Sequence, residues 1–186
     1  MRRPDFITTT VAASALVLPA VHVSAATASR AGQGAQVQVA LVGVGSQGRV
    51  LLNAVRQIPN VRVRALCDMW EYARNYGQKY LARYGQNVDV YNDYREMLDK
   101  ESSLDAVLIA TPDFAHAPQA IACFEKGLHV YCEPMLAQNV DAVRSVLKSA
   151  AHTGKLLQVG FQRRSNPRYQ HVHQRLLQEA QLAGSL

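Results

Sequence analysis

Residues 37–49, VQVALVGVGSQGR, decide the fold of this chain. The stretch begins as an apolar run rich in Val and Leu, which is typical of a strand buried on both faces of a sheet. It then turns through the spacing Gly43-x-Gly45-x-x-Gly48 and continues as residues 49–55, RVLLNAV, which predict a helix. Strand, glycine turn and helix in this order match the dinucleotide-binding fingerprint.

Each glycine of the turn has its own expected task. Gly43 permits the tight turn, Gly45 lets the backbone approach a pyrophosphate, and Gly48 lets the helix pack closely on the strand. The helix N-terminus adds unpaired N–H groups and the positive end of its dipole. The candidate cofactor-binding residues of the turn are Gly43, Val44, Gly45, Ser46, Gln47 and Gly48.

An acidic residue supports this interpretation. Residues 61–68, VRVRALCD, predict a second strand ending in Asp68, 20 residues after Gly48, which is the interval expected for the acid that binds the ribose hydroxyls. The alternative is a solvated loop aspartate beside a structural glycine turn. Asp68 favours NAD, because a carboxylate repels the 2′-phosphate of NADP. Arg74 lies close enough in sequence to keep NADP as an alternative.

Length and composition indicate one soluble globular domain. The chain has 186 residues, 48% of them apolar, and a net charge of +6. A basic chain can bind nucleic acid, but no basic helix, aromatic stacking platform or zinc spacing supports such a partner. An anionic cofactor or a solvated face explains the charge better.

The cysteines and histidines predict no metal site. Three cysteines without a CxxC spacing indicate neither a disulfide framework nor a zinc site, so small buried hydrophobic side chains are expected. His171-x-His173 is not the spacing that ligands on a helix need.

Residues 1–25 predict an export signal. Arg2-Arg3 precedes an apolar run over residues 11–21 that is too short to span a bilayer comfortably, and Val23-Ser24-Ala25 offers small residues for cleavage. The segment resembles a twin-arginine signal, and an ordinary secretory signal is the alternative. We therefore expect a periplasmic or extracellular protein with no membrane attachment after signal removal, and a linker over residues 26–36.

From Val37 onward, strands and helices alternate, which predicts an α/β fold with a doubly wound parallel sheet of about six strands. Asn92 is a candidate cap for a short helix over residues 93–99. The expected strands cover residues 37–43, 61–68, 88–91, 104–110, 128–132 and 155–160. The expected helices cover residues 47–57, 71–84, 93–99, 115–126, 139–152 and 167–181.

Four tyrosines in the second expected helix recur every four residues, at Tyr72, Tyr76, Tyr80 and Tyr84. This period predicts one packed face of that helix.

Ligands of such sheets bind beyond the carboxyl ends of the strands. The loops that follow the last three expected strands are residues 110–116, ATPDFAH; residues 132–137, CEPMLA; and residues 160–167, GFQRRSNP. Together with the glycine turn and Asp68, they converge on one edge of the sheet, which predicts a single site there.

These motifs carry a resemblance. From about Val37 to the C-terminus the chain resembles the N-terminal cofactor domain of the Gfo/Idh/MocA oxidoreductases, a family that includes glucose–fructose oxidoreductase and inositol dehydrogenase. The matching segments are residues 43–48, GVGSQG; residues 110–112, ATP, with His116; residues 129–133, HVYCE; and residues 160–164, GFQRR. The resemblance implies NAD or NADP as cofactor and a sugar, cyclitol or related hydroxyl as substrate. The same fold also serves glycosidases that use NAD transiently.

The resemblance also implies roles for individual residues. Glu133 contacts the nicotinamide side of the cofactor and is a catalytic candidate, as is His116 near the nicotinamide. The alternative for His116 is a structural hydrogen bond at the helix start. Gln162 and Arg163 match a segment near the active site, with a solvated loop as the alternative. The remaining candidate cofactor contacts are Ala110, Thr111 and Pro112.

The chain departs from the family in two ways. The family loop Glu-Lys-Pro is here Glu133-Pro134-Met135, so the lysine that helps to move the hydroxyl proton is replaced by a residue that cannot transfer one. The family also continues with a second α/β domain. We expect residues 37–165 to form the dinucleotide-binding domain and residues 166–186 to form a final helix and the start of that second domain, which is absent here. Bare apolar surface then predicts a homo-oligomer or poor solubility.

The function predicted first is an NAD(P)-dependent oxidoreductase acting on a sugar or cyclitol. The alternatives are a nucleotide-binding module without turnover of its own, suggested by Pro134 and the absent second domain, and a relative of the NAD-using glycosidases. A structural domain with a relic cleft is a further possibility.

Overall fold

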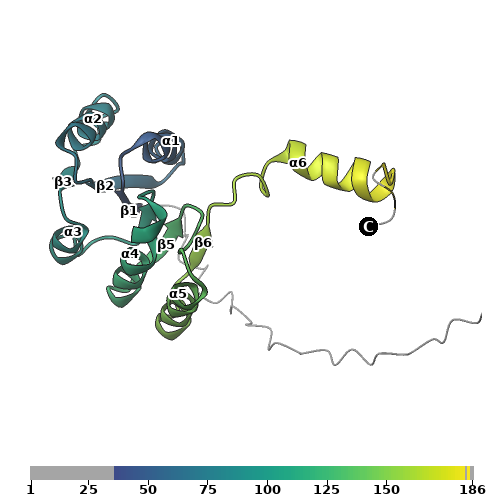
Figure 1. The fold of residues 1–186 in the computed structure, drawn as a ribbon. Helices are drawn as coiled ribbons and strands as arrows, with labels where there is room; N and C mark the ends of the chain where they lie inside the picture. The colour runs from purple at the N-terminus through teal and green to yellow at the C-terminus, as the bar shows by residue number, and fades with distance from the viewer. Residues whose placement is uncertain (1–35, 183, 185–186) are drawn as a thin grey trace, which may run out of the picture. The chain divides into compact units, whose positions relative to one another are not determined.

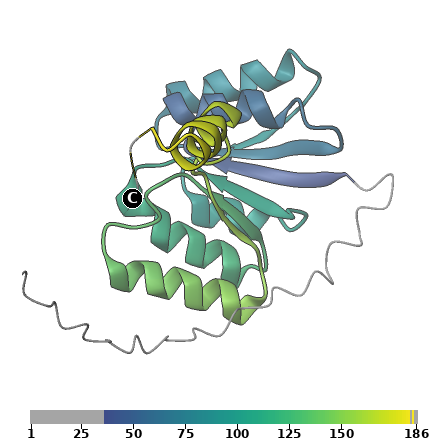
Figure 2. The ribbon, with the colours of Figure 1, turned by 90° about the vertical axis from the view of Figure 1, so that its right-hand side faces the viewer.

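Six parallel strands form one sheet, in the order β3-β2-β1-β4-β5-β6, in the computed structural model of the chain (Figures 1 and 2). The structure describes residues 36–182 and 184, so the predicted export signal and residues 26–35 of the predicted linker lie outside it. The strands are β1 (Val37–Val42), β2 (Val61–Cys67), β3 (Asp89–Tyr91), β4 (Ala106–Ile109), β5 (His129–Cys132) and β6 (Leu157–Val159). The strand order confirms the predicted doubly wound sheet, whose direction of winding reverses between β1 and β4.

Helices cover both faces of this sheet. Figure 1 shows α1 and α2 on one face and α3, α4 and α5 on the other. The helices are α1 (Ser46–Val55), α2 (Glu71–Ala82), α3 (Tyr94–Lys100), α4 (Asp113–Glu125), α5 (Val140–Thr153) and α6 (Pro167–His171), and α6 continues as the π-helical segment η2 (Val172–Glu179).

The central strand β1 is apolar at consecutive positions because it lies between two hydrophobic cores. Val39 and Leu41 pack into the core beneath α1 and α2, whereas Ala40 and Val42 pack into the core beneath α3, α4 and α5. Successive side chains of a strand point to opposite faces, so a strand with helices on both sides must be apolar throughout. The strand therefore ends between two cores, and the glycine turn follows at that point.

Most helix ends agree with the sequence signals. Asn139 caps α5 by accepting a hydrogen bond from the backbone N–H of Ala142 at 2.8 Å, and Gly154 ends the same helix with a φ of +66°. The predicted cap at Asn92 is wrong. Asp93 caps α3 instead, because its carboxylate accepts from the backbone N–H of Arg95 at 2.8 Å.

The cysteines are buried, as predicted. Cys67, Cys123 and Cys132 are free and belong to the core beneath α3, α4 and α5. Burial raises the pKa of the Cys123 thiol to about 12, so it behaves as a small hydrophobic group.

Two other expectations need correction. Tyr72 and Tyr84 of the predicted packed face are about half exposed, because these rings pack against arginines of α1 and not into the core. The predicted final helix begins at Pro167 but widens to π-helical geometry from Val172. In the described part of the chain, no helix has the length and apolar character needed to cross a membrane.

Candidate functional site

The glycine turn joins β1 to α1 at the carboxyl edge of the sheet. Gly43 has a φ of +93°, which only glycine adopts readily, and its backbone N–H donates to the carbonyl oxygen of Cys67 at 2.8 Å. A Cβ at Gly43 would lie 2.6 Å from the carbonyl oxygen of Ala110. Gly43 therefore lies between the ends of β2 and β4, and a residue with a side chain does not fit at this position.

Gly48 is confined by its own turn. A Cβ at this position would overlap the carbonyl oxygen of Gly43, so only a glycine fits here in the first turn of α1. The close helix–strand approach predicted for Gly48 is thus seen in the structure.

Gly45 is different, because nothing in the described fold requires a glycine there. Its φ of −70° suits any residue, and no atom lies within 4 Å of a Cβ built on it. No side chain caps the α1 N-terminus within the described residues, and Ser46 and Gln47 are exposed. Space and free N–H donors at a helix N-terminus are what an anion needs.

Asp68 lies beside this turn. Its Oδ2 accepts from the backbone N–H of Val44 at 2.7 Å, and its Oδ1 accepts from that of Trp70 at 2.8 Å. Each carboxylate oxygen keeps a lone pair for a further donor. The predicted pairing of acid and glycine turn is therefore present in the geometry, and the carboxylate is fixed in orientation.

Arg74 binds the backbone behind Asp68. One terminal nitrogen of its guanidinium donates to the carbonyl oxygens of Asp68 at 2.6 Å and Met69 at 2.9 Å. Arg74 thus stabilises the end of β2 and leaves the carboxylate of Asp68 without a charged partner among the described residues.

The loop after β4 is held by two polar side chains of α4. Thr111 Oγ1 donates to Gln119 Oε1 at 2.7 Å. His116 is 1% exposed, and its ring nitrogens lie 2.7 Å from two backbone carbonyl oxygens, Nε2 from that of Thr111 and Nδ1 from that of Met135. The ring therefore ties the loop after β4 to the loop after β5. This arrangement favours the structural alternative considered for His116, since no ring nitrogen is left for a ligand.

The loop after β5 places Glu133 at the site. Its Oε1 accepts from the hydroxyl of Tyr131 at 3.0 Å. Burial, followed by this hydrogen bond and the nearby charge of Glu133, raises the pKa of Tyr131 to about 12, so the phenol stays protonated as a donor.

Two neighbouring clefts lie where these loops meet. One, of about 390 Å³, brings Gln47 of the glycine turn together with residues of the loops after β5 and β6. Its other lining residues are Glu133, Pro134, Gly160, Phe161, Gln162, Arg163 and Arg164. Four predicted site residues, Gln47, Glu133, Gln162 and Arg163, therefore share one cleft, although Gln47 lies far from the other three in the sequence.

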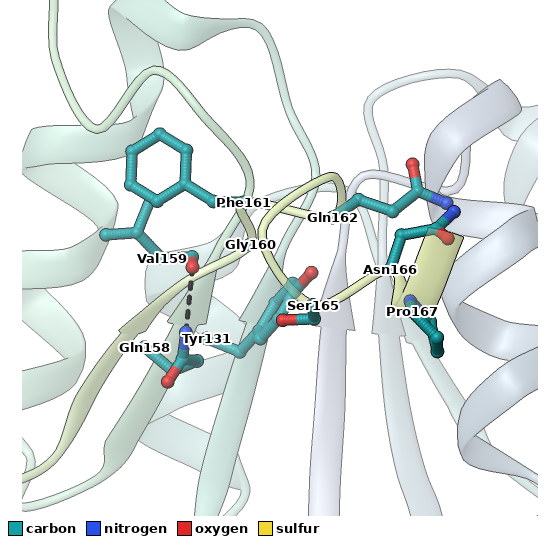
Figure 3. Close-up of a pocket in the computed structure, with 9 residues that line it drawn as sticks. All are labelled: Tyr131, Gln158, Val159, Gly160, Phe161, Gln162, Ser165, Asn166 and Pro167. Atoms are coloured by element: carbon teal, nitrogen blue, oxygen red, sulfur yellow. Dashed lines mark hydrogen bonds between the residues drawn. The ribbon is translucent and has the colours of Figure 1, made fainter. Parts of the chain in front are cut away.

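The second cleft, of about 550 Å³, is shown in Figure 3. Tyr131 of β5 and Gln158 of β6 line it together with the loop from Gly160 to Pro167, and Gln158 Nε2 donates to the Val159 carbonyl at 2.8 Å. Tyr131 was not among the predicted site residues. The two-residue period of a strand could have indicated it, because Tyr131 precedes Glu133 by two positions and so lies on the same face of the strand, whereas Val130 and Cys132 are buried.

No group of three or more His, Cys, Asp or Glu side chains within the described residues is placed to hold a metal ion.

The sequence of this region matches a known family. Residues 37–161 match the model of the Gfo/Idh/MocA oxidoreductases, described as an oxidoreductase family with an NAD-binding Rossmann fold. The chain belongs to the Gfo/Idh/MocA family. The family model describes an NAD-binding fold, and the solved structures similar to this chain include complexes with NAD(H).

Curated relatives share about a third of the aligned residues. An inositol 2-dehydrogenase of Rubrobacter xylanophilus is 32% identical over 144 residues, which cover 76% of this chain and 39% of the relative. A 4-carboxy-2-hydroxymuconate-6-semialdehyde dehydrogenase of Sphingobium is 32% identical over 142 residues, covering 76% and 43%. A glycosyl hydrolase family 109 protein of Stenotrophomonas maltophilia is 31% identical over 163 residues, covering 83% and 34%.

A solved structure shows the same fold. The WlbA dehydrogenase of Chromobacterium violaceum, in complex with NADH and UDP-GlcNAcA, superposes with a TM-score of 0.68 at 26% identity, covering 80% of this chain and 41% of that one. The present chain thus spans about two fifths of the length of these Gfo/Idh/MocA relatives.

Proposed function

We propose that the chain binds NAD(H) across its glycine turn and serves as the cofactor domain of an oxidoreductase acting on a sugar or cyclitol hydroxyl. The observation that carries the proposal is Gly45, whose φ of −70° and open surroundings give the fold itself no steric reason for a glycine. A pyrophosphate at the α1 N-terminus supplies that reason, because a side chain would occupy its place.

The residues of the site fit the remainder of this cofactor. Asp68 offers two fixed carboxylate oxygens to ribose hydroxyls, and it disfavours a 2′-phosphate. Ala110, Thr111 and Pro112 lie at the carboxyl end of β4, next to Gly43. When bound, the nicotinamide supplies hydride acceptance or donation.

The cleft shared by Gln47 and Glu133 is the proposed place of the nicotinamide and substrate. Glu133 is oriented by the Tyr131 hydroxyl, and Gln162 and Arg163 offer donors from the opposite loop. A hydroxyl-bearing substrate suits these polar groups. The relatives named as inositol dehydrogenase and WlbA dehydrogenase support this class of substrate.

The decisive experiment titrates the purified chain with NADH and follows the nicotinamide fluorescence. We expect saturable binding by the wild type and at least a tenfold loss in Gly45→Val. Ala54→Val, which adds bulk at an exposed position on the same helix, is the matched control and is expected to bind normally. Equal NADH affinity in the wild type and Gly45→Val would contradict the proposal.

A second candidate is a nucleotide-binding module without turnover of its own. Pro134 favours it, because this residue stands where the family carries a proton-transferring lysine, and general acid–base steps contribute about 10²- to 10⁴-fold to rates. The assay is reduction of NAD in the presence of myo-inositol and other cyclitols. Turnover by the isolated chain would exclude this candidate.

A glycosidase that uses NAD is the other candidate, supported by the similarity to the glycosyl hydrolase family 109 protein. It predicts release of nitrophenol from nitrophenyl glycosides only when NAD is added. A rate that does not depend on NAD would contradict it.

Export to the periplasm or exterior is also part of the proposal, and it rests on Arg2-Arg3 and the apolar run over residues 11–21. Cell fractionation tests it. Replacing both arginines by lysine is expected to retain the protein inside the cell if the twin-arginine route is used, and an ordinary secretory signal would tolerate the change.

A further inference from the structure

A row of tyrosines and arginines lies on the α1 and α2 face of the sheet, and no part of the proposed function uses it. Both helices lie on the same side of the sheet (Figure 1). We call this surface the Tyr–Arg ladder; it consists of Arg49 and Arg56 from the α1 region and Tyr72, Tyr76, Tyr80 and Tyr84 from the α2 region. Tyr72 is 57% exposed and Tyr84 is 50% exposed, so the ladder faces solvent.

Arg49 is fixed at one end of the ladder. Its guanidinium carbon lies 3.9 Å from the ring centroid of Tyr76 and 5.7 Å from that of Tyr72. Its Nε donates to the carbonyl oxygen of Val44 at 3.2 Å. The ring and this hydrogen bond together hold the planar group in one orientation.

Arg56 repeats the arrangement at the other end. Its guanidinium carbon lies 4.0 Å from the ring centroid of Tyr84. Its Nε donates to the Tyr80 hydroxyl at 2.7 Å and to Asn53 Oδ1 at 3.2 Å, and that hydroxyl donates to the same Asn53 oxygen at 2.8 Å. Both arginines are thus held by a ring and by Nε, and their terminal nitrogens keep donors for an oxyanion.

The spacing of the two arginines suits a pair of carboxylates. They are seven residues apart, and Arg56, which directly follows α1, keeps helical φ and ψ angles. The two arginines therefore lie on one face of the helix, about 10.5 Å apart along its axis. Two carboxylates seven residues apart on a partner helix have the same separation. A fixed guanidinium binds a carboxylate in a bidentate manner and loses little side-chain entropy in doing so.

The charge of the surface points the same way. Residues 46–56 and 70–83 contain five cationic side chains and one carboxylate, that of Glu71. The cations are Arg49, Arg56, Arg74, Lys79 and Arg83. None of the five has a carboxylate partner within 4 Å among the residues that the structure describes. The surface is therefore complementary to an acidic partner.

The ring faces argue against nucleic acid as that partner. Arg49 covers Tyr76, Arg56 covers Tyr84, and the rings of Tyr76 and Tyr80 are stacked with an interplanar angle of 7°. Nucleobases need free aromatic faces on which to stack, and most of the ring faces of the ladder are already covered by arginines or by other rings. Tyrosine and arginine are instead among the residues that contribute most of the binding energy at protein–protein interfaces.

Neither terminal segment of the chain supplies two such carboxylates. Residues 1–36 contain one carboxylate side chain, Asp5, and residues 166–186 contain one, Glu179, which pairs with Arg175 at 2.7 Å. A second copy would bring the same excess of positive charge to the interface if the ladders faced each other.

We propose that the Tyr–Arg ladder is a docking surface for an acidic helix of a partner protein, with Arg49 and Arg56 each binding one carboxylate. The two clefts of about 280 and 250 Å³ along α2 and between the helices receive the side chains around those carboxylates.

The test uses a fluorescein-labelled helical peptide with two glutamates seven residues apart in an alanine- and leucine-rich background, and a twin with glutamines at the same places. Fluorescence anisotropy with the full chain at physiological salt is expected to show at least tenfold tighter binding of the glutamate peptide. Arg56→Gln is expected to weaken binding of the glutamate peptide at least tenfold. Arg56→Lys is expected to restore only part of the lost affinity, because an ammonium group cannot bind a carboxylate through two parallel N–H donors as a guanidinium does.

Arg95→Gln is the matched control, because Arg95 also stacks on a tyrosine, Tyr94, at 4.6 Å but lies on α3. Circular dichroism and NADH titration of the Arg56 variants establish that the fold and the cofactor site are intact. An equal loss in Arg95→Gln would overturn the proposal, as would equal affinity for the two peptides or no binding at millimolar peptide. Tighter binding of an oligothymidylate of equal charge would assign the surface to nucleic acid. Self-association that Arg56→Gln abolishes would assign it to a second copy of the chain.

Discussion

The Oδ2 atom of Asp68 accepts a hydrogen bond from the backbone N–H of Val44 at 2.7 Å, and this bond joins the end of β2 to the glycine turn. The bond spans 24 residues of sequence and fixes the acid next to the helix N-terminus that an anionic ligand requires. The acid and the turn therefore act as one unit, and changing either one affects the other.

Asp68→Asn tests the acid. The amide keeps the size of the side chain but has one acceptor oxygen and no charge, so we expect NADH affinity to fall about tenfold, the loss of one charge-assisted hydrogen bond. NADPH affinity is expected to change less or to rise, because the repulsion of a 2′-phosphate is removed. Titrations with NADH and with NADPH measure the ratio of the two affinities. Asp141→Asn, at an exposed position in α5, serves as control, and an unchanged ratio in Asp68→Asn would contradict the assigned role.

Gly48→Ala tests the turn as a structural device. The added Cβ overlaps the Gly43 carbonyl oxygen, which cannot move without breaking the turn, so we expect a loss of about 1–3 kcal/mol or more in the free energy of unfolding. Gly45→Ala, with open space around its Cβ, is expected to leave that free energy nearly unchanged. Urea denaturation of the two variants separates the roles, and equal losses would show that Gly45 is also structural.

The contrast between these two glycines shows what the sequence alone can predict. The spacing predicts the turn, the order of strands and helices predicts the sheet, and the edge of the sheet predicts which loops meet. All three follow from local rules that hold for any chain with this pattern. The shared cleft of Gln47 and Glu133 follows from the same topology.

What the sequence did not reveal depends on contacts between distant side chains. The tyrosine period of α2 predicts a packed face, but the residues that cover it are arginines of another helix, which no period of α2 can reveal. Likewise, His116 is suggested as a catalytic group by its place in a motif, yet its two carbonyl partners come from loops that only the folded chain brings together.

His116→Ala tests that structural bond. The substitution leaves a cavity at a buried position and two backbone carbonyl oxygens without their partner, so we expect a loss of roughly 2–5 kcal/mol in the free energy of unfolding. Urea denaturation measures it. His152→Ala, at an exposed position of α5, is the control for loss of an imidazole. A stable His116→Ala protein that binds NADH normally but has lost turnover would instead support the catalytic role.

His129 predicts a pH dependence of stability. Its Nδ1 accepts a hydrogen bond from the backbone N–H of Leu156 at 3.0 Å, which only an unprotonated Nδ1 can do. Burial lowers the pKa of His129 from the ordinary value of 6.5, and the nearby charge of Lys155 lowers it further. The charge of Asp105 acts in the opposite direction and offsets only part of this effect. Because the unfolded chain binds the proton more readily, the contribution of His129 to stability is complete above pH 6.5 and is lost as the pH falls through the lower pKa of the folded state.

Urea denaturation between pH 7.5 and about 5 measures that contribution. His129→Asn retains an acceptor for the Leu156 N–H but cannot titrate, so its stability is expected to fall less steeply over this range than that of the wild type. His152→Asn removes an exposed imidazole from α5 and is expected to keep the wild-type slope. If His129→Asn also follows the wild-type slope, the loss of stability on acidification comes from other groups, and the hydrogen bond between β5 and the start of β6 has no part in it.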